Sequence, residues 1–189
     1  MGCRHSTPTE ITENEAVEEM ADGFCDPAPP APTDSRLPLS ALQVFKLKKS
    51  WKGIKRSLEP TGIEMFVRMF KANQGLQSLF SSFKDLKTSD ELRVNEALEK
   101  HAGIVMGVLD ECISNIDNVD YILDILTKTG ASHKNFSGFT AEFFWEIETP
   151  FLESVKLTLG DRYTDNMDSI YKITIKLILE NLVKGIKES

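Results

Sequence analysis

From Leu37 onward, apolar residues recur every three or four positions, which is the period of a helix with one buried face. No stretch alternates strictly between apolar and polar residues, as a half-buried strand would. Beyond Pro38 the chain has only two further prolines, Pro60 and Pro150. The pattern therefore predicts an all-α domain of seven to eight helices, and residues 37–189 are enough to enclose a core.

The expected helices are bounded by start signals. Pro60 suits a first helical turn, Thr88 and Glu91 have capping-box spacing, and Thr164 is of the N-cap type. Residues 73–86 break the period, so no long helix is expected there. The predicted helices cover residues 37–58, 60–70, a helix starting near 89, 95–116, 121–134, 140–159 and 164–187.

Residues 1–36 differ from the rest in composition. They hold eight acidic and two basic residues, so they carry −6 of the net charge of −7 and leave −1 for residues 37–189. Six of the eight prolines lie in this segment or directly after it, and residues 27–32 read as a stiff, extended spacer. We expect an acidic, flexible tail over 1–36 and one folded domain over 37–189.

Charge and motifs exclude several classes. A nearly neutral domain gives no reason to expect nucleic acid as a partner. The three cysteines form no Cys-x-x-Cys site, and no apolar run has the length of a membrane span. Residues 117–120 lack the oxygen ligands of an EF-hand loop, and a phosphate-binding loop is missing. A basic run over residues 46–56 is typical of a solvated helix face, although it could also lie against anionic lipid.

Two histidines stand on apolar helix faces, where a titratable group is costly unless it is bonded. With the residues around them, in chain order, they resemble the globin family over essentially all of residues 37–189. The stretches nearest to the family pattern are Phe66-Val-Arg-Met-Phe70, Leu76-Gln-Ser-Leu-Phe80, His101-Ala-Gly-Ile-Val105 and Gly130-Ala-Ser-His133. Trp51 also matches the globin family in chain order, and we expect it to be a core residue.

The resemblance implies the globin fold and a haem pocket. His133 is similar to the proximal ligand of haem iron, and His101 to the distal histidine. Without a Cys-x-x-Cys-His motif, haem is expected to be non-covalent, of the b type. The residues expected to contact it are Phe66, Phe80, Phe83, Val105, Phe139, Phe143 and Phe144. The last three are assigned by allowing one more residue between His133 and the next helix than neuroglobin has.

The two histidines are 32 positions apart, which is similar to the neuroglobin and cytoglobin branch. That branch implies bis-histidyl, six-coordinate iron and binding of oxygen, nitric oxide and carbon monoxide. Three positions depart from family habit: Gln74 replaces a proline, Ile104 a basic residue that reaches a haem propionate, and Thr129 a leucine. They leave the propionate contacts and the ligand affinity open.

The first residues, Met-Gly-x-x-x-Ser, have the form of an N-myristoylation signal at Gly2, and Cys3 could accept a palmitoyl chain. A myristoyl group alone anchors weakly, and the acidic tail supplies no polybasic signal, so we expect both acyl groups. The chain then resembles globin X, an acylated branch, on the cytoplasmic face of the plasma membrane. That resemblance implies redox work near the bilayer, as nitrite reduction or protection against reactive oxygen species, with an unknown electron donor. The alternative is a lipid-tethered helical adaptor without haem.

Overall fold

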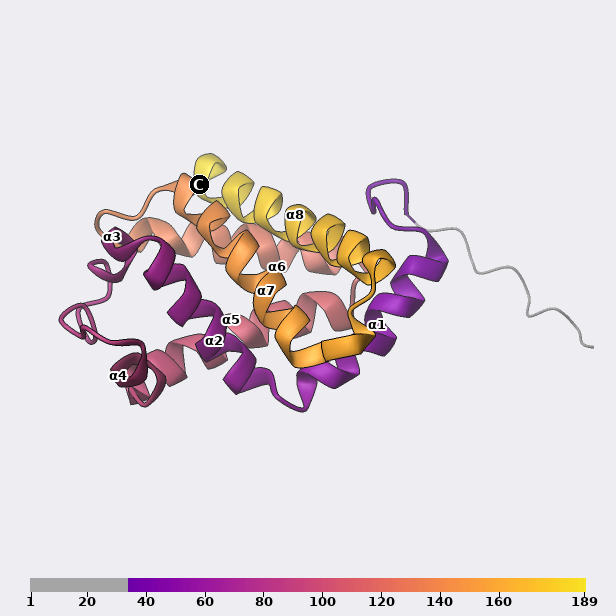
Figure 1. The fold of residues 1–189 in the computed structure, drawn as a ribbon. Coiled ribbons are helices and arrows are strands. Elements are labelled where there is room, and N and C mark those ends of the chain that lie inside the picture. Colours follow the sequence, from indigo (N-terminus) through magenta and orange to yellow (C-terminus); the bar gives the residue numbers. More distant parts are fainter. Residues whose placement is uncertain (1–33) are drawn as a thin grey trace, which may run out of the picture.

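Eight α-helices and three short 3₁₀ helices build residues 34–189, the part of the chain that the computed structural model describes (Figure 1). No strand occurs in this part, and none of its helices is long and apolar enough to cross a membrane. In chain order the elements are α1 (Ala41–Lys55), α2 (Leu58–Ala72), α3 (Gln74–Gln77), α4 (Ser89–Arg93), α5 (Glu96–Ser114), α6 (Val119–Ser132), η1 (His133–Asn135), η2 (Ala141–Ile147), α7 (Glu148–Leu159), η3 (Gly160–Arg162) and α8 (Asp165–Glu188). The all-α prediction is confirmed. The tail prediction falls largely on residues 1–33, outside the described part.

Two of the three predicted start signals act as N-caps, and the third, Pro60, lies in the first turn of α2. At α4 the Thr88 hydroxyl accepts the Glu91 backbone N–H at 3.2 Å, and the Glu91 carboxylate accepts the Thr88 N–H at 2.9 Å. At α8 the Thr164 hydroxyl accepts the N–H of Met167 at 3.3 Å. These bonds satisfy backbone donors that have no partner inside a first helical turn. The pattern between 73 and 86 gives only the four-residue α3, followed by turns.

The expectation of one helix over residues 140–159 is wrong. A 3₁₀ helix, η2, occupies Ala141–Ile147, and the α-helix α7 begins only at Glu148. Pro150 supplies the reason, because its ring clashes with the carbonyl four residues earlier and it has no N–H to donate. The proline is therefore accommodated in the first turn of α7. The preceding residues wind more tightly and carry Phe143 and Phe144.

Two helix crossings depend on glycine. α8 lies along α6, and a Cβ on Gly130 would fall 2.1 Å from the carbonyl oxygen of Leu182. Where α2 crosses α5, a Cβ on Gly62 would lie 2.6 Å from the Met106 side chain. Real Cβ atoms do not approach other atoms so closely, so both pairs of helices come nearer than larger residues would permit.

Trp51 anchors the core away from the candidate site, as the sequence predicts. Its side chain is buried, and its Nε1–H donates to the Asp110 carboxylate at 2.8 Å. The rings of Phe151 and Tyr171 pack against it, with centroids 6.4 Å away in each case. Cys112 is buried in the same core, and burial raises the pKa of its thiol to about 12, so it behaves as a small apolar residue.

Candidate functional site

A cavity of about 550 Å³ lies between α2, α5, α6 and α8, with the segments after α3 and α6 along its sides. It brings together residues that lie far apart in the sequence. All nine of the expected site residues outside the tail line this cavity: Phe66, Phe80, Phe83, His101, Val105, His133, Phe139, Phe143 and Phe144. Gly2 and Cys3 belong to residues 1–33, outside the described part.

His133 follows the last residue of α6 and is held by backbone and aromatic contacts. Its Nδ1 lies 2.8 Å from the carbonyl oxygen of Thr129, one turn earlier. A carbonyl can only accept, so Nδ1–H donates and the Nε2 of the neutral ring keeps its lone pair. The rings of Phe139 and Phe144 pack against the imidazole, with centroids at 4.8 and 4.7 Å. Tautomer and orientation are thus set before any ligand binds.

His101 lies in the second turn of α5 and is half-buried. Phe66 and Phe80 meet its ring edge-on, each with a centroid separation of 5.0 Å. Within residues 34–189, no protein group hydrogen-bonds to its imidazole. Burial lowers the pKa of His101 below its usual 6.5, and the nearby His133 lowers it further. The ring is therefore neutral at pH 7, the form in which imidazole binds metals.

An aromatic wall surrounds His101 between α2 and the turn after α3. Phe80 and Phe83 stack at 4.9 Å with an interplanar angle of 19°. Phe70 packs behind both rings, at 5.4 and 5.8 Å. Aromatic pairs of this geometry contribute attraction beyond the area they bury, so the rings stabilise one another as an apolar wall.

Sequence reasoning missed the cavity wall formed by α8. Ile175, Ile178, Leu179 and Leu182 line it from that helix. Their spacing of three, one and three positions is visible in the sequence, but it is the spacing of any buried helix face. Only the packing of α8 against α6 turns this face toward the cavity. The other lining residues that were missed are Met69, Leu76, Leu79, Ser81, Ser82, Ala97, Val108, Leu109, Ser132, Phe136, Ser137 and Ile147.

The three positions that depart from the usual globin residues differ in whether they line the cavity. Ile104 and Thr129 line the cavity, whereas Gln74 begins α3 and does not. Ile104 is 60% exposed, so it lies at the open edge of the cavity. Among the described residues, no lysine, arginine or carboxylate lines the cavity, and its polar side chains besides the histidines are all serines or Thr129. The site is thus an apolar, largely aromatic slot with one imidazole on α5 and another after α6.

This geometry agrees with comparisons to known proteins. The Globin family model matches residues 63–182. The chain belongs to the globin family. Neuroglobin of Dissostichus mawsoni is 31% identical over 140 residues, which are 74% of this chain and 87% of that protein. Cytoglobin-1 of Oryzias latipes is 27% identical over 96 residues, about half of each chain (51% and 54%).

A solved structure resembles this globin more fully. It is a crystal structure of a hexacoordinated haem protein from an anhydrobiotic tardigrade, determined at pH 4. The two chains are 37% identical, and the superposition has a TM-score of 0.79, covering 82% of this chain and 99% of the tardigrade protein. The globin fold expected from the sequence is therefore confirmed.

Proposed function

We propose that the cavity binds haem b, with His133 as the proximal and His101 as the distal iron ligand. The main support is that two imidazoles line one apolar cavity and differ in their hydrogen bonding. The His133 Nδ1–H is engaged by Thr129, which directs Nε2 toward a metal, while His101 has no competing hydrogen bond within the described residues. Imidazole nitrogens and aromatic walls are what an iron porphyrin requires.

The donor set favours non-covalent haem. Cys112 does not line the cavity, and its thiol is buried in the hydrophobic core. Retention of haem would therefore depend on the two histidines and on packing against side chains such as Phe80, Val105 and Phe144. Because no basic side chain of the described part lines the cavity, we expect hydroxyl groups and water rather than lysine or arginine at the propionates.

When bound, haem supplies a ferrous iron that takes up oxygen, nitric oxide or carbon monoxide and can give one electron to nitrite, which with two protons yields nitric oxide and water. His101 would hold the distal position until an external ligand arrives. The apparent affinity for an external ligand then equals the intrinsic affinity multiplied by the fraction of molecules in which His101 has moved away from the iron. Displaced, its ring can donate a hydrogen bond to bound oxygen and, once it has taken up a proton from solvent, can pass that proton to nitrite.

We further propose that Gly2 and Cys3 carry acyl groups that keep this globin at the cytoplasmic face of the plasma membrane. The support is the signal form of residues 1–6 and the acidity of the residues that follow, which excludes a polybasic second signal in the tail. A tethered protein is poorly suited to bulk oxygen transport. Redox work near the bilayer, with an electron donor still to be identified, suits it better.

Absorption spectra of the purified full chain test haem binding and ligation. We expect a Soret band, and in the deoxygenated ferrous protein sharp paired visible bands from two imidazole ligands. His133→Ala should lose these paired bands and retain less haem. His101→Leu should keep the Soret band and show the single broad ferrous band of five-coordinate iron. A wild-type chain without a Soret band after haem addition would instead support the helical adaptor.

A further inference from the structure

The structure separates the basic residues of the 46–56 run into two groups. Lys48 forms an ion pair with Asp117 at 2.7 Å, and Lys55 one with Asp110 at 3.0 Å. The remaining four are Lys46, Lys49, Lys52 and Arg56. In the part of the chain that the structure describes, none of these four has an ion pair, although Lys46 donates to the Asn166 side chain at 3.0 Å.

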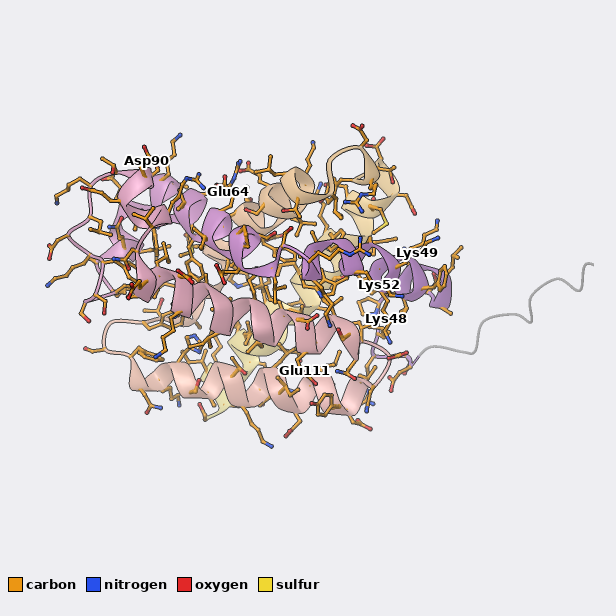
Figure 2. All side chains as sticks on the ribbon, turned by 90° about the horizontal axis from the view of Figure 1, so that it is seen from below. Lys48, Lys49, Lys52, Glu64, Asp90 and Glu111 are labelled. Carbon is orange, nitrogen blue, oxygen red and sulfur yellow. The ribbon has the colours of Figure 1, made fainter. Side chains whose placement is uncertain are left out.

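Three of these cations lie on one face of α1, and Arg56, the residue directly after the helix, continues that face. At 100° per residue they fall within a sector that also holds Leu42 and Phe45. The opposite sector is buried and comprises Val44, Leu47, Trp51 and Ile54. We call the exposed sector the α1 basic face; its members are Leu42, Phe45, Lys46, Lys49, Lys52 and Arg56. Figure 2 shows Lys49 and Lys52 at the α1 end of the molecule, away from Glu64 and Asp90.

The α1 basic face combines positive charge with exposed apolar side chains. Leu42 and Phe45 are 55% and 62% exposed, near the N-terminal end of the helix. The Lys49 ammonium lies 6.0 Å from the centroid of the Phe45 ring. α1 itself contains no acidic residue. Arg162 adds a further cation, because its guanidinium would lie 3.2 Å from a Cβ on Gly53, in the same sector.

We propose that the α1 basic face docks onto a membrane surface containing anionic phospholipids. Lysine and arginine would lie among the headgroups, while Leu42 and Phe45 enter the boundary with the acyl chains. Charge complementarity selects anionic lipid over neutral lipid. The 15 residues of α1 span about 22 Å and present these groups on one side of the helix, as an interfacial helix does.

The position of α1 in the chain supports a membrane surface as the binding partner of the α1 basic face. It is the first helix after the N-terminal segment, so it is the helix nearest in sequence to the proposed acyl groups at Gly2 and Cys3. A single myristoyl chain binds membranes only marginally, with an association constant on the order of 10⁴ M⁻¹. The α1 basic face would add an electrostatic contact that the acidic tail lacks, and it would orient the globin domain on the bilayer.

This inference extends the proposed membrane association. The test uses the full chain produced without acyl transferases, so its result does not depend on acylation. Sedimentation is measured with vesicles of phosphatidylcholine alone and of phosphatidylcholine mixed with phosphatidylserine. We expect binding only to the mixed vesicles, lost at high salt. Lys49→Gln combined with Lys52→Gln should weaken binding about 30-fold, from the contribution of each lysine near an anionic surface. Phe45→Ser should weaken it as well.

The matched control is Lys71→Gln combined with Lys84→Gln, an equal loss of charge at exposed lysines outside α1. It should bind mixed vesicles nearly as well as wild type, and circular dichroism should show that all variants are folded. Equal loss in the control pair, equal binding to neutral vesicles, or no binding at low salt would overturn the proposal. Faster proteolysis of residues 1–33 in the Lys49/Lys52 variant without vesicles would also overturn it, because the face would then bind its own acidic segment.

Discussion

Gly130 and Gly185 face one another's helices where α6 and α8 touch. A Cβ on Gly130 would lie 2.1 Å from the Leu182 carbonyl oxygen, and one on Gly185 would lie 2.2 Å from the Thr127 carbonyl oxygen. Each glycine therefore admits the backbone of the other helix. The contact matters for the candidate site, because His133 directly follows α6 and Leu182 of α8 lines the cavity.

Gly130→Ala should destabilise the protein by about 3 kcal/mol, because the new methyl group meets backbone that cannot rotate away. Separation of α6 from α8 should also loosen the cavity and speed haem loss. Urea unfolding and haem transfer to an acceptor protein measure the two effects. Gly107→Ala is the matched control: nothing lies within 4 Å of its Cβ position in α5, so it should stabilise by about 0.5 kcal/mol. Equal effects of the two variants would contradict the close contact.

His101→Leu should raise the apparent affinity for carbon monoxide. If His101 occupies iron in about nine molecules of ten, removing it gives about a tenfold gain. Flash photolysis of the ferrous protein reads out the internal ligand directly as a slow phase that the variant lacks. Val108→Leu, which alters another residue lining the cavity without removing a ligand, is the control. Unchanged binding kinetics in His101→Leu would rule out the internal ligand.

Glu64 should make stability depend on acid pH. Burial by itself would raise its pKa, but hydrogen bonds from Arg93 and Arg68 outweigh burial and lower the pKa below the ordinary 4.5. The folded state thus favours the charged form. Its stabilising contribution is present above the unfolded-state pKa and is lost as the pH falls through the lower folded-state pKa.

Glu64→Gln should therefore cost about 2 kcal/mol at neutral pH and flatten the decline of the unfolding free energy in acid. Urea denaturation at a series of pH values measures both quantities. Glu59→Gln, on the same helix and exposed, should leave the pH dependence unchanged. A Glu64→Gln profile parallel to wild type would show that this carboxylate contributes little.

Gly2→Ala should release most of the protein expressed in cells to the soluble fraction, because myristoylation requires the N-terminal glycine. Cys3→Ser should weaken attachment to the level that one acyl chain and the α1 basic face can sustain. Cell fractionation and metabolic labelling with fatty acids follow both steps. Retention of both variants at membranes would contradict acylation as the anchor, whatever the vesicle experiments on α1 show.

Most helices could be predicted from local pattern, because a buried helical face repeats every three to four residues and caps are recognisable within one turn. Thr88 and Thr164 show this. The start of α7 was misplaced because the spacing of Phe143, Phe144 and Phe151 looks continuous, while the effect of Pro150 acts on residues before it. The nine cavity residues were located by resemblance to a family, since no local pattern distinguishes Phe80 from a core phenylalanine.

The sequence by itself determined the all-helical fold and the concentration of negative charge in residues 1–36, and it singled out the two histidines that line the cavity. Only the tertiary structure decided that Nδ1 of His133 is taken by Thr129, that α8 supplies a cavity wall, and that the basic residues of α1 divide into paired and unpaired groups. The physical reason is distance along the chain. Periodicity and caps arise within a few residues, whereas the cavity and the ion pairs of α1 join side chains that only packing brings together.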